Sequence, residues 1–166
     1  YKNKVNYLDF SIMDKWIISK LNVFIRDCNS SLEQFRSDIM MRKFDLFLDD
    51  LSNWYIRRSR RRFWKSEDDL DKQTAYQVLY ECLTTVIKLI SPVLPFVTEE
   101  IYQNLVKNIN SDEHESIHLC DYPSSDLKKI DIELMKNIDS LRRVVELGRS
   151  ARNKAKIKIR QPLSEL

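Results

Sequence analysis

A single glycine, Gly148, occurs in the 166 residues of this sequence, and only four prolines accompany it. Sandwiches, barrels and doubly wound sheets need many tight turns, and glycine supplies much of the backbone freedom that those turns require. A chain with so little glycine is therefore expected to fold as long helices joined by short polar loops. Hydrophobic residues make up 43% and charged residues 32% of the sequence, which is typical of a globular protein with a sizeable core.

Apolar residues recur every three or four positions along five stretches, and this period predicts amphipathic helices. The first helix is expected from about Ser11 to Glu33, because Asp14 follows Ser11 by three residues in a capping-box arrangement. The other helices are expected over about residues 37–63, 71–91, 95–106 and 129–154. Pro92 and Pro95 separate the third helix from the fourth.

The end of the sequence has a different period. Charged and apolar residues alternate strictly there, in the order Lys156, Ile157, Lys158, Ile159 and Arg160. This alternation predicts a short strand at 155–160. The fold class we expect is therefore all-α, an antiparallel helix bundle of about five helices with a short C-terminal β-strand. We expect a four-helix domain over residues 1–125, and a fifth helix that begins a C-terminal extension over 126–166.

Several classes of protein are disfavoured by the sequence. No run of eighteen apolar residues is present, so no membrane-spanning helix is expected, and no signal peptide is recognisable. Three cysteines, Cys28, Cys82 and Cys120, are odd in number and far apart, which favours free thiols in a reducing compartment over disulfides or zinc. The chain begins at Tyr1 and stops at Leu166 within a motif, so we expect it to be a fragment of a longer protein.

The stretch from Arg57 to Lys65 is the strongest candidate for function, because six of its nine residues are basic. At about 100° per residue, a helix turns one set of these side chains away from the apolar stripe. The members of this set are Arg57, Arg60, Arg61 and Trp64. Arginines neutralise phosphates and flat side chains stack on unpaired bases, so this set favours RNA binding. The alternative is a solvated basic helix end, stabilised by the helix dipole.

Two other arginines of this stretch are expected to serve the fold. Arg58 and Arg62 fall in phase with Leu51 and Phe44, on the core side of the predicted helix. We expect them to close the end of the bundle by pairing with carboxylates. The candidate carboxylates are Asp49, Asp50, Glu99 and Glu100.

A second basic segment follows Gly148 and contains no acidic residue. It consists of Arg149, Arg152, Lys154, Lys156, Lys158 and Arg160. On the expected strand, the last three of these side chains point to one side and could track phosphates. The alternative is an edge strand that its lysines protect from pairing with other chains.

Neither catalysis nor a metal site is indicated. His114 and His118 lie in a polar loop without a third ligand at suitable spacing, so surface histidines are expected. Glu99 and Glu100 are adjacent on a predicted helix and diverge by about 100°, so they do not form an acid–base pair. One of them is expected to pair with an arginine across the bundle. The sequence contains no GxGxxG, P-loop or Ser/His/Asp arrangement.

Four stretches resemble the anticodon-binding domain of isoleucyl-tRNA synthetases, and their order along the chain is the same. They are LDDLSNWYIRRSRRRFW (Leu48–Trp64), LYECLTTVIKLISPVLPFVTEEIYQNL (Leu79–Leu105), SIHLCDYP (Ser116–Pro123) and GRSARNKAKIKIRQPL (Gly148–Leu163). The SPVLPFVTEEIY segment is shared with valyl and other class I relatives, whereas NWYIRRSRRRFW and KIRQPL are more specific. The form of the motifs is similar to the eukaryotic cytoplasmic and archaeal type.

This resemblance implies a helical bundle that binds the anticodon stem-loop of tRNA(Ile) in a cytoplasmic enzyme that attaches isoleucine. The implied partners are this tRNA and the catalytic and C-terminal domains of the same chain, with no membrane. ATP, with magnesium, belongs to the parent enzyme, so no cofactor and no catalytic residue are expected here. The RNA-binding residues that the resemblance favours are Asn53 as a base reader, Arg57, Arg60, Arg61, Trp64 and Lys65, followed by Lys156, Lys158 and Arg160.

Three alternatives stay open. The chain could belong to a related class Ia synthetase, valyl, leucyl or methionyl, which swapping the anticodon in a binding assay would test. It could be a helical protein–protein interaction module, whose docking face should have an apolar centre and a polar rim rather than an arginine cluster. It could be a free-standing enzyme, against which the sequence offers no convergent nucleophile, base or metal constellation.

Overall fold

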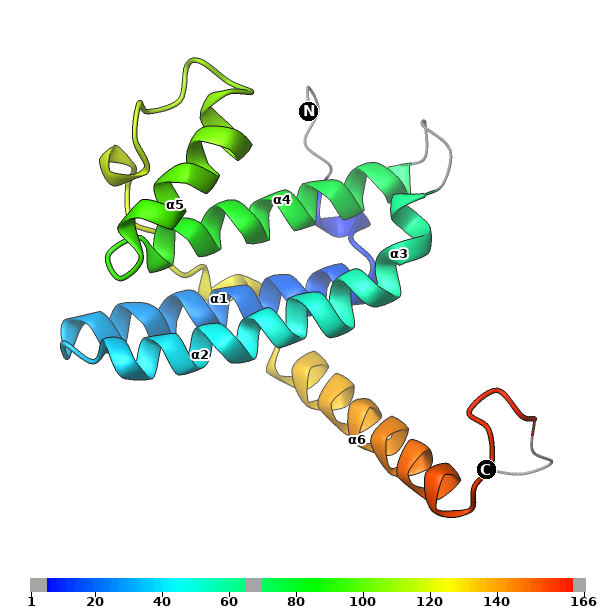
Figure 1. Cartoon of the computed structure of the whole chain (residues 1–166). Coiled ribbons are helices and arrows are strands. Elements are labelled where there is room, and N and C mark those ends of the chain that lie inside the picture. Colours follow the sequence, from blue (N-terminus) through cyan, green and yellow to red (C-terminus); the bar gives the residue numbers. More distant parts are fainter. Residues whose placement is uncertain (1–5, 65–69, 163–166) are drawn as a thin grey trace. The chain divides into compact units, whose positions relative to one another are not determined.

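A computed structural model of the chain describes residues 6–64 and 70–162 (Figure 1). By its internal contacts the chain divides into two compact units, Tyr1–Ile130 and Asp131–Leu166. The expected domain division after residue 125 stays a prediction about the whole protein. No helix in the two described ranges is both long enough and apolar enough to cross a membrane.

The described part of the first unit is a bundle of helices. Its α-helices are α1 (Ile12–Glu33), α2 (Ser37–Asp49), α3 (Arg57–Phe63), α4 (Leu70–Ile90) and α5 (Pro95–Tyr102). Two π-helical segments, η2 (Asp50–Ile56) and η3 (Gln103–Lys107), continue α2 and α5 without a break, and three single 3₁₀ turns are η1 (Tyr7–Asp9), η4 (Ile117–Leu119) and η5 (Leu127–Lys129). The second unit contains α6 (Ile132–Lys154). With residues 37–63 counted as one continuous helix, the expectation of about five helices is confirmed for the part of the chain that is described.

The core of the first unit lies between α1, the long helix from Ser37 to Phe63, and α4. Ser11 caps α1 in the expected capping box, and the apolar stripe that follows is buried. The rings of Phe24 and Phe47 stack with their centroids 5.2 Å apart, which joins α1 to α2. The fully buried side chains of largest volume in this core include Trp16, Ile17, Ile18, Leu21, Met40, Tyr55 and Val78. Packing of one apolar face of each helix therefore holds the bundle together.

The helix from Ser37 to Phe63 is not α-helical throughout, and this changes which side chains face the core. A π-helical turn accommodates one more residue than an α-helical turn, so every later residue is rotated backwards around the helix axis. After η2 the buried position falls on Ser59, which is 2% exposed, whereas Arg58 is exposed. The expectation that Arg58 lies on the core side is therefore wrong.

The polar stretch after η3 returns along the bundle as an extended segment. Tyr102 donates to the carbonyl of His114 at 2.9 Å, and the ring of Tyr102 packs with Ile117 in a small core cluster. Further along, the Tyr122 hydroxyl donates to the Leu89 carbonyl at 2.8 Å. The backbone N–H of Asp126 donates to the Asn22 side chain at 2.8 Å. Residues 114–126 thus cross α4 and reach α1.

The second unit differs from its expectation at the C-terminal end. No strand is present between Ala155 and Pro162, so the predicted strand at 155–160 is wrong. The backbone instead turns at Lys156, whose φ is +54°, and the N–H of Ile157 donates to the Arg152 carbonyl at 2.9 Å. The Arg152 guanidinium then donates to the carbonyls of Lys158 and Gln161, at 3.1 and 2.7 Å. Local hydrogen bonds satisfy this backbone, and alternation alone does not create a strand without a neighbour.

Gly148 lies inside α6, where a glycine has no conformational purpose. Its φ is not positive, and a Cβ added there meets no atom within 4 Å. We expect Gly148→Ala to stabilise α6 by about 0.5–1 kcal/mol, because alanine loses less backbone entropy in a helix. Hydrogen exchange of the α6 amides should slow accordingly, and Ala151→Gly, the matched control in the same helix, should accelerate it. Faster exchange in Gly148→Ala would contradict this expectation.

Candidate nucleic-acid interface

The last two turns of the long helix carry an exposed basic surface, which we call the arginine surface and define as Arg57, Arg60, Arg61 and Trp64. The three arginines are exposed, and Trp64 exposes 79% of its surface. None of these arginines forms an ion pair with another described residue. The structure therefore brings together the four residues that the helical period had placed on one arc.

Two open grooves lie on the arginine surface. One is lined by Ser52, Ile56, Arg57, Arg60, Phe63, Trp64 and Tyr76. The other is lined by Arg57, Arg58, Arg60, Arg61 and Trp64. Tyr76 comes from α4 and packs edge-on against Phe63, with ring centroids 5.1 Å apart. The first groove thus combines aromatic walls with a guanidinium rim, which suits a flat base attached to a phosphate.

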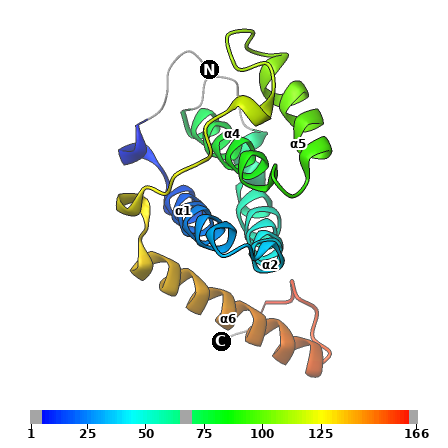
Figure 2. The same cartoon turned by 90° about the vertical axis from the view of Figure 1, so that its left-hand side faces the viewer.

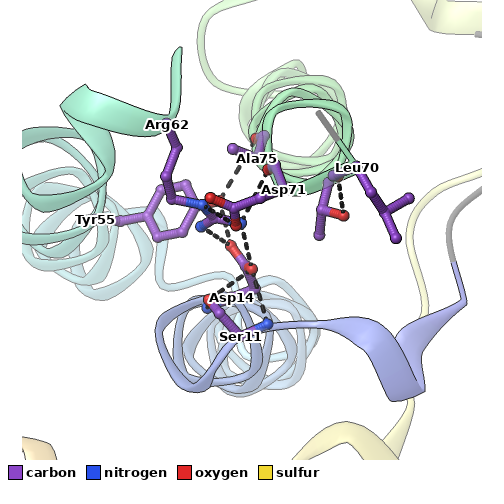
Figure 3. Close-up of polar contacts among 8 residues, drawn as sticks. Ser11, Asp14, Tyr55, Arg62, Leu70, Asp71 and Ala75 are labelled. Carbon is purple, nitrogen blue, oxygen red and sulfur yellow. Dashed lines mark hydrogen bonds and ion pairs between the residues drawn. The ribbon is translucent and has the colours of Figure 1, made fainter. Parts of the chain in front are cut away.

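Arg62 points the opposite way, into the bundle, and anchors the arginine surface to α1 and α4 (Figure 3). Its two terminal nitrogens each donate to one carboxylate oxygen of Asp14, both at 2.8 Å. Its Nε donates to the Asp71 carboxylate at 2.7 Å. The Arg62 side chain is 14% exposed and the Asp14 side chain is fully buried. A bidentate pair of this kind fixes orientation as well as charge.

Tyr55 and Ser11 complete the set of donors around Asp14, and the Ser11 backbone N–H contributes one of these hydrogen bonds, to Oδ2 at 3.0 Å. The Tyr55 hydroxyl donates to Asp14 Oδ1 at 2.6 Å, and the Ser11 hydroxyl donates to Oδ2 at 2.6 Å. Burial alone would raise the pKa of Asp14, but hydrogen bonds from Arg62, Ser11 and Tyr55 lower that pKa below its ordinary value. Burial and the neighbouring Asp14 carboxylate raise the pKa of Tyr55. Asp14 is therefore a buried anion whose charge the fold requires.

Of the two arginines that were expected to close the end of the bundle, only Arg62 does so. Arg62 closes the end of the bundle as expected, but it does so through Asp14 and Asp71 rather than through any of the four expected carboxylates. Arg58 instead lies over the ring of Trp54, with its Cζ 4.8 Å from the ring centroid. The partner Asp14 was hidden from sequence analysis because its capping box already explained an acidic residue at that position.

The remaining predicted RNA-binding residues fall in different places. Asn53 is exposed on η2, where its side-chain amide donates to Asp49 at 2.6 Å. Lys65 lies outside the described residues. Lys156, Lys158 and Arg160 are exposed in the turn after α6, in the second unit.

Glu99 has a structural role that differs from the expected arginine pair. Its carboxylate accepts hydrogen bonds from the Ser116 hydroxyl at 2.8 Å, the Ile117 N–H at 3.0 Å and the Gln103 amide at 2.7 Å. Glu100 accepts from the Asn104 amide at 3.0 Å. Neither glutamate forms an ion pair with an arginine of the described chain, so that expectation is wrong.

The histidines and cysteines form no metal cluster within residues 6–64 and 70–162. His114 and His118 are exposed. Cys28 and Cys82 are buried, Cys120 is partly buried, and all three are free thiols. Burial raises the pKa of Cys28 to about 12 and that of Cys82 well above its ordinary value. These two thiols are therefore poor nucleophiles.

A helical bundle with an arginine-rich helix end is compatible with RNA binding. Comparison with known proteins shows the family to which this chain belongs. Residues 14–166 match the family described as the anticodon-binding domain of tRNA ligase, and the chain belongs to this family.

The individual relatives show which tRNA ligases this chain is similar to. The chain is 48% identical to an isoleucine–tRNA ligase of Clostridium novyi (strain NT), over 99% of this chain and 16% of the relative. It is 49% identical to the same ligase of Dehalococcoides mccartyi (strain CBDB1), over 93% of this chain and 15% of the relative. For the ligase of Chlamydia caviae the identity is 42%, over 95% of this chain and 15% of the relative. The chain thus spans about one sixth of the length of these relatives.

The resemblance to isoleucyl-tRNA synthetases is confirmed, but its subtype is corrected. The similar proteins are bacterial, so the expected eukaryotic cytoplasmic or archaeal type is wrong. That assignment rested on the form of the NWYIRRSRRRFW and KIRQPL segments.

Proposed function

We propose that this chain recognises the anticodon stem-loop of tRNA(Ile) and that the arginine surface makes the principal contacts. The observation that carries the proposal is the position of Trp64, 79% exposed among three exposed arginines without ion-pair partners in the described chain. A large aromatic side chain on a charged face gains free energy when a partner covers it. An unpaired base with its attached phosphate satisfies the ring and the guanidinium groups together.

The two kinds of side chain have different tasks. Arg57, Arg60 and Arg61 neutralise phosphates and set the orientation of the stem-loop, which adds affinity without sequence information. Trp64 and the aromatic walls of the adjoining groove stack on an unstacked base, and Asn53 reads the edge of a base. Lys65 and the exposed Lys156, Lys158 and Arg160 are proposed as further phosphate contacts.

In the whole protein this domain serves an isoleucine–tRNA ligase of the cytoplasm. Its catalytic and C-terminal domains attach isoleucine to the bound tRNA in a reaction that uses ATP with magnesium. The names of the relatives support this proposal, and the free cysteines fit a reducing compartment. The described residues contribute binding and positioning to this reaction.

The experiment is filter binding of the chain and of the full-length protein to a tRNA(Ile) transcript at low salt. Exchange of the anticodon for that of valine, leucine or methionine should weaken binding by about 5- to 150-fold, because each polar group left unpaired costs roughly 1–3 kcal/mol. Equal binding to all four transcripts would contradict anticodon recognition, and preference for another anticodon would assign the domain to another class Ia enzyme.

Salt dependence separates this proposal from a protein-interaction module. If phosphate contacts dominate, the logarithm of the association constant should fall linearly with the logarithm of the salt concentration. Binding that does not depend on salt, or no binding at all by either protein at low salt, would contradict the RNA proposal.

A further inference from the structure

Arg58 is an exposed arginine of α3 that takes no part in the core of the bundle. When the first unit is viewed nearly along its helices, α1 and α4 lie on one side of the long helix from Ser37 to Phe63 (Figure 2). The π-helical segment η2 turns Ser59 into the core and leaves Arg58 outside. The direction of Arg58 is therefore set by the backbone of the helix and not by an ion pair.

The ring of Trp54 holds the guanidinium group of Arg58. The Cζ atom of Arg58 lies 4.8 Å from the centroid of that ring, in a cation–π contact between residues one turn apart on the same helix. Trp54 is itself partly buried, which restricts the motion of its ring. The other exposed arginines in the described part of α3, Arg57, Arg60 and Arg61, lie over no aromatic ring. Arg58 is thus preorganised, and a ligand that binds it costs less side-chain entropy.

Arg58 also lines an open groove on the arginine surface. The volume of this groove is about 610 Å³, within the roughly 300–1,000 Å³ of small-ligand sites. Trp54 is not part of the wall of the groove, so the guanidinium group of Arg58 stands between that ring and the groove. Within residues 6–64 and 70–162, Arg58 forms no ion pair and no carboxylate lines this groove. One face of the guanidinium plane is therefore available to a ligand.

This arrangement favours a flat base over a phosphate alone. A phosphate needs a positive charge, whereas a guanidinium group that lies on a ring also presents a plane, and unpaired RNA bases stack on arginine planes as they do on aromatic rings. Arg58 and Trp64 lie about 9 Å apart along the helix at 1.5 Å per residue, but neighbouring nucleotides of one strand are spaced at about 3.4 Å. A base on Arg58 is therefore not the base that stacks on Trp64.

We propose that Arg58, positioned by Trp54, stacks on a second unpaired base of the anticodon loop. This inference rests on the proposed function, in which Trp64 stacks on a first base. Arg58 binds RNA directly, and Trp54 is a positioning residue that acts through Arg58. Two separate flat side chains on one groove select an unpaired loop over a duplex, because the bases of a duplex are stacked on one another and offer no free face.

Arg58→Lys in the full-length protein separates stacking from charge, because lysine keeps the positive charge but has no planar face. Filter binding to a tRNA(Ile) transcript should weaken by about 5- to 30-fold, in the lower part of the range for one stacked base, and the salt slope should stay the same. Arg42→Lys makes the same exchange at an exposed position of α2 and should leave binding unchanged. Equal affinity of Arg58→Lys and the original protein would overturn the proposal, as would a lower salt slope, which would make Arg58 a phosphate ligand.

Trp54→Leu tests the positioning of Arg58, because it removes the ring and leaves the guanidinium group in place. It should also weaken binding several-fold, and the addition of Arg58→Lys should cause no further loss, since both substitutions break the same stack. Additive losses would contradict the positioning role of Trp54. Arg58→Lys alters an exposed residue, so the test of stacking does not depend on whether Trp54→Leu folds.

Transcripts that lack a single base identify the partner of each side chain. An abasic nucleotide is placed in turn at every unpaired position of the anticodon loop. At one position, loss of the base should weaken binding of the original protein by about 5- to 30-fold and leave the affinity of Arg58→Lys unaffected. The same relation should hold for Trp64→Ala at a different position. One position coupled to both residues, or no position coupled to Arg58, would overturn the proposal.

The abasic transcripts also distinguish failure of this inference from failure of the proposed function. A base coupled to Trp64, with none coupled to Arg58, supports the proposed function and overturns the inference. A base coupled to Arg58, with none coupled to Trp64, supports the inference and contradicts the role of Trp64. Equal binding of all abasic and anticodon-exchanged transcripts contradicts both.

Discussion

Replacement of Arg62 by leucine is expected to lower the free energy of unfolding by about 3–5 kcal/mol at neutral pH, the usual cost of leaving one member of a buried ion pair alone. Asp14 is fully buried, and without Arg62 it keeps only Tyr55 and Ser11 as side-chain donors. Chemical denaturation followed by circular dichroism at 222 nm measures the change.

The loss of stability in Arg62→Leu should depend on pH in a defined direction. In the original protein the pKa of Asp14 is lowered, so its contribution to stability is present above the ordinary aspartate pKa of about 3.9 and is lost as the pH falls through the lowered value. In the variant, burial without Arg62 should raise this pKa, and protonation then removes the uncompensated charge. The difference in stability between the two proteins should therefore shrink as the pH falls from about 7 to about 4.

Arg61→Leu is the matched control for Arg62→Leu. The two arginines are neighbours on α3, but Arg61 is exposed and has no ion pair within the described ranges. Its replacement should change stability by no more than about 0.5 kcal/mol. A loss below about 1 kcal/mol for Arg62→Leu would contradict the role assigned to the pair, because a buried unpaired charge costs more than that.

Replacement of Trp64 by alanine is expected to weaken tRNA(Ile) binding by about 5- to 150-fold, because stacking of one base on an aromatic ring contributes roughly 1–3 kcal/mol. Trp64 exposes 79% of its surface, so its loss should leave stability almost unchanged. The slope of affinity against salt should also stay the same, because a ring displaces no counterions. Filter binding over a range of salt concentrations measures both quantities.

The double variant Arg57→Gln/Arg61→Gln is the complement of Trp64→Ala. It should weaken binding and also reduce the salt slope by about 0.7 for each single-strand phosphate that is no longer neutralised. If Trp64→Ala binds tRNA(Ile) as tightly as the original protein does, the ring is not part of the interface. An unchanged salt slope in the double variant would mean that these arginines bind no phosphate.

The sequence predicted the helices well because helix formation here depends on local pattern. The apolar period and the Ser11–Asp14 capping box defined α1, and the two prolines around residue 93 defined the break before α5. The arc of Arg57, Arg60, Arg61 and Trp64 also agreed with the structure, since adjacent turns of one helix keep their relative phase. All of these features involve residues close to one another in the sequence.

The sequence did not predict the features that depend on residues far apart along the chain. The pairing of Arg62 with Asp14 joins residues 48 positions apart, and no local pattern indicates it. The predicted strand failed for a related reason, because a strand needs a neighbour that alternation cannot supply. Lys156 turns the chain instead, and Arg152 satisfies the carbonyls that follow. The predicted direction of Arg58 was wrong because it assumed an α-helix through Asp50–Ile56.

The π-helical segment η2 has a consequence for how related sequences correspond to this one. A homologue that lacks one residue between Asp50 and Ile56 would form an uninterrupted α-helix, and its later residues would keep the facing that they have here, because the π-helical turn accommodates one extra residue. Its counterpart of Ser59 would still face the bundle, whereas an uninterrupted α-helix of the same length as this one would turn Arg58 toward the bundle instead. A one-residue gap at this place therefore preserves the facing of the residues that follow it, whereas a homologue of equal length without the π-helical turn would present different residues on the RNA-facing side.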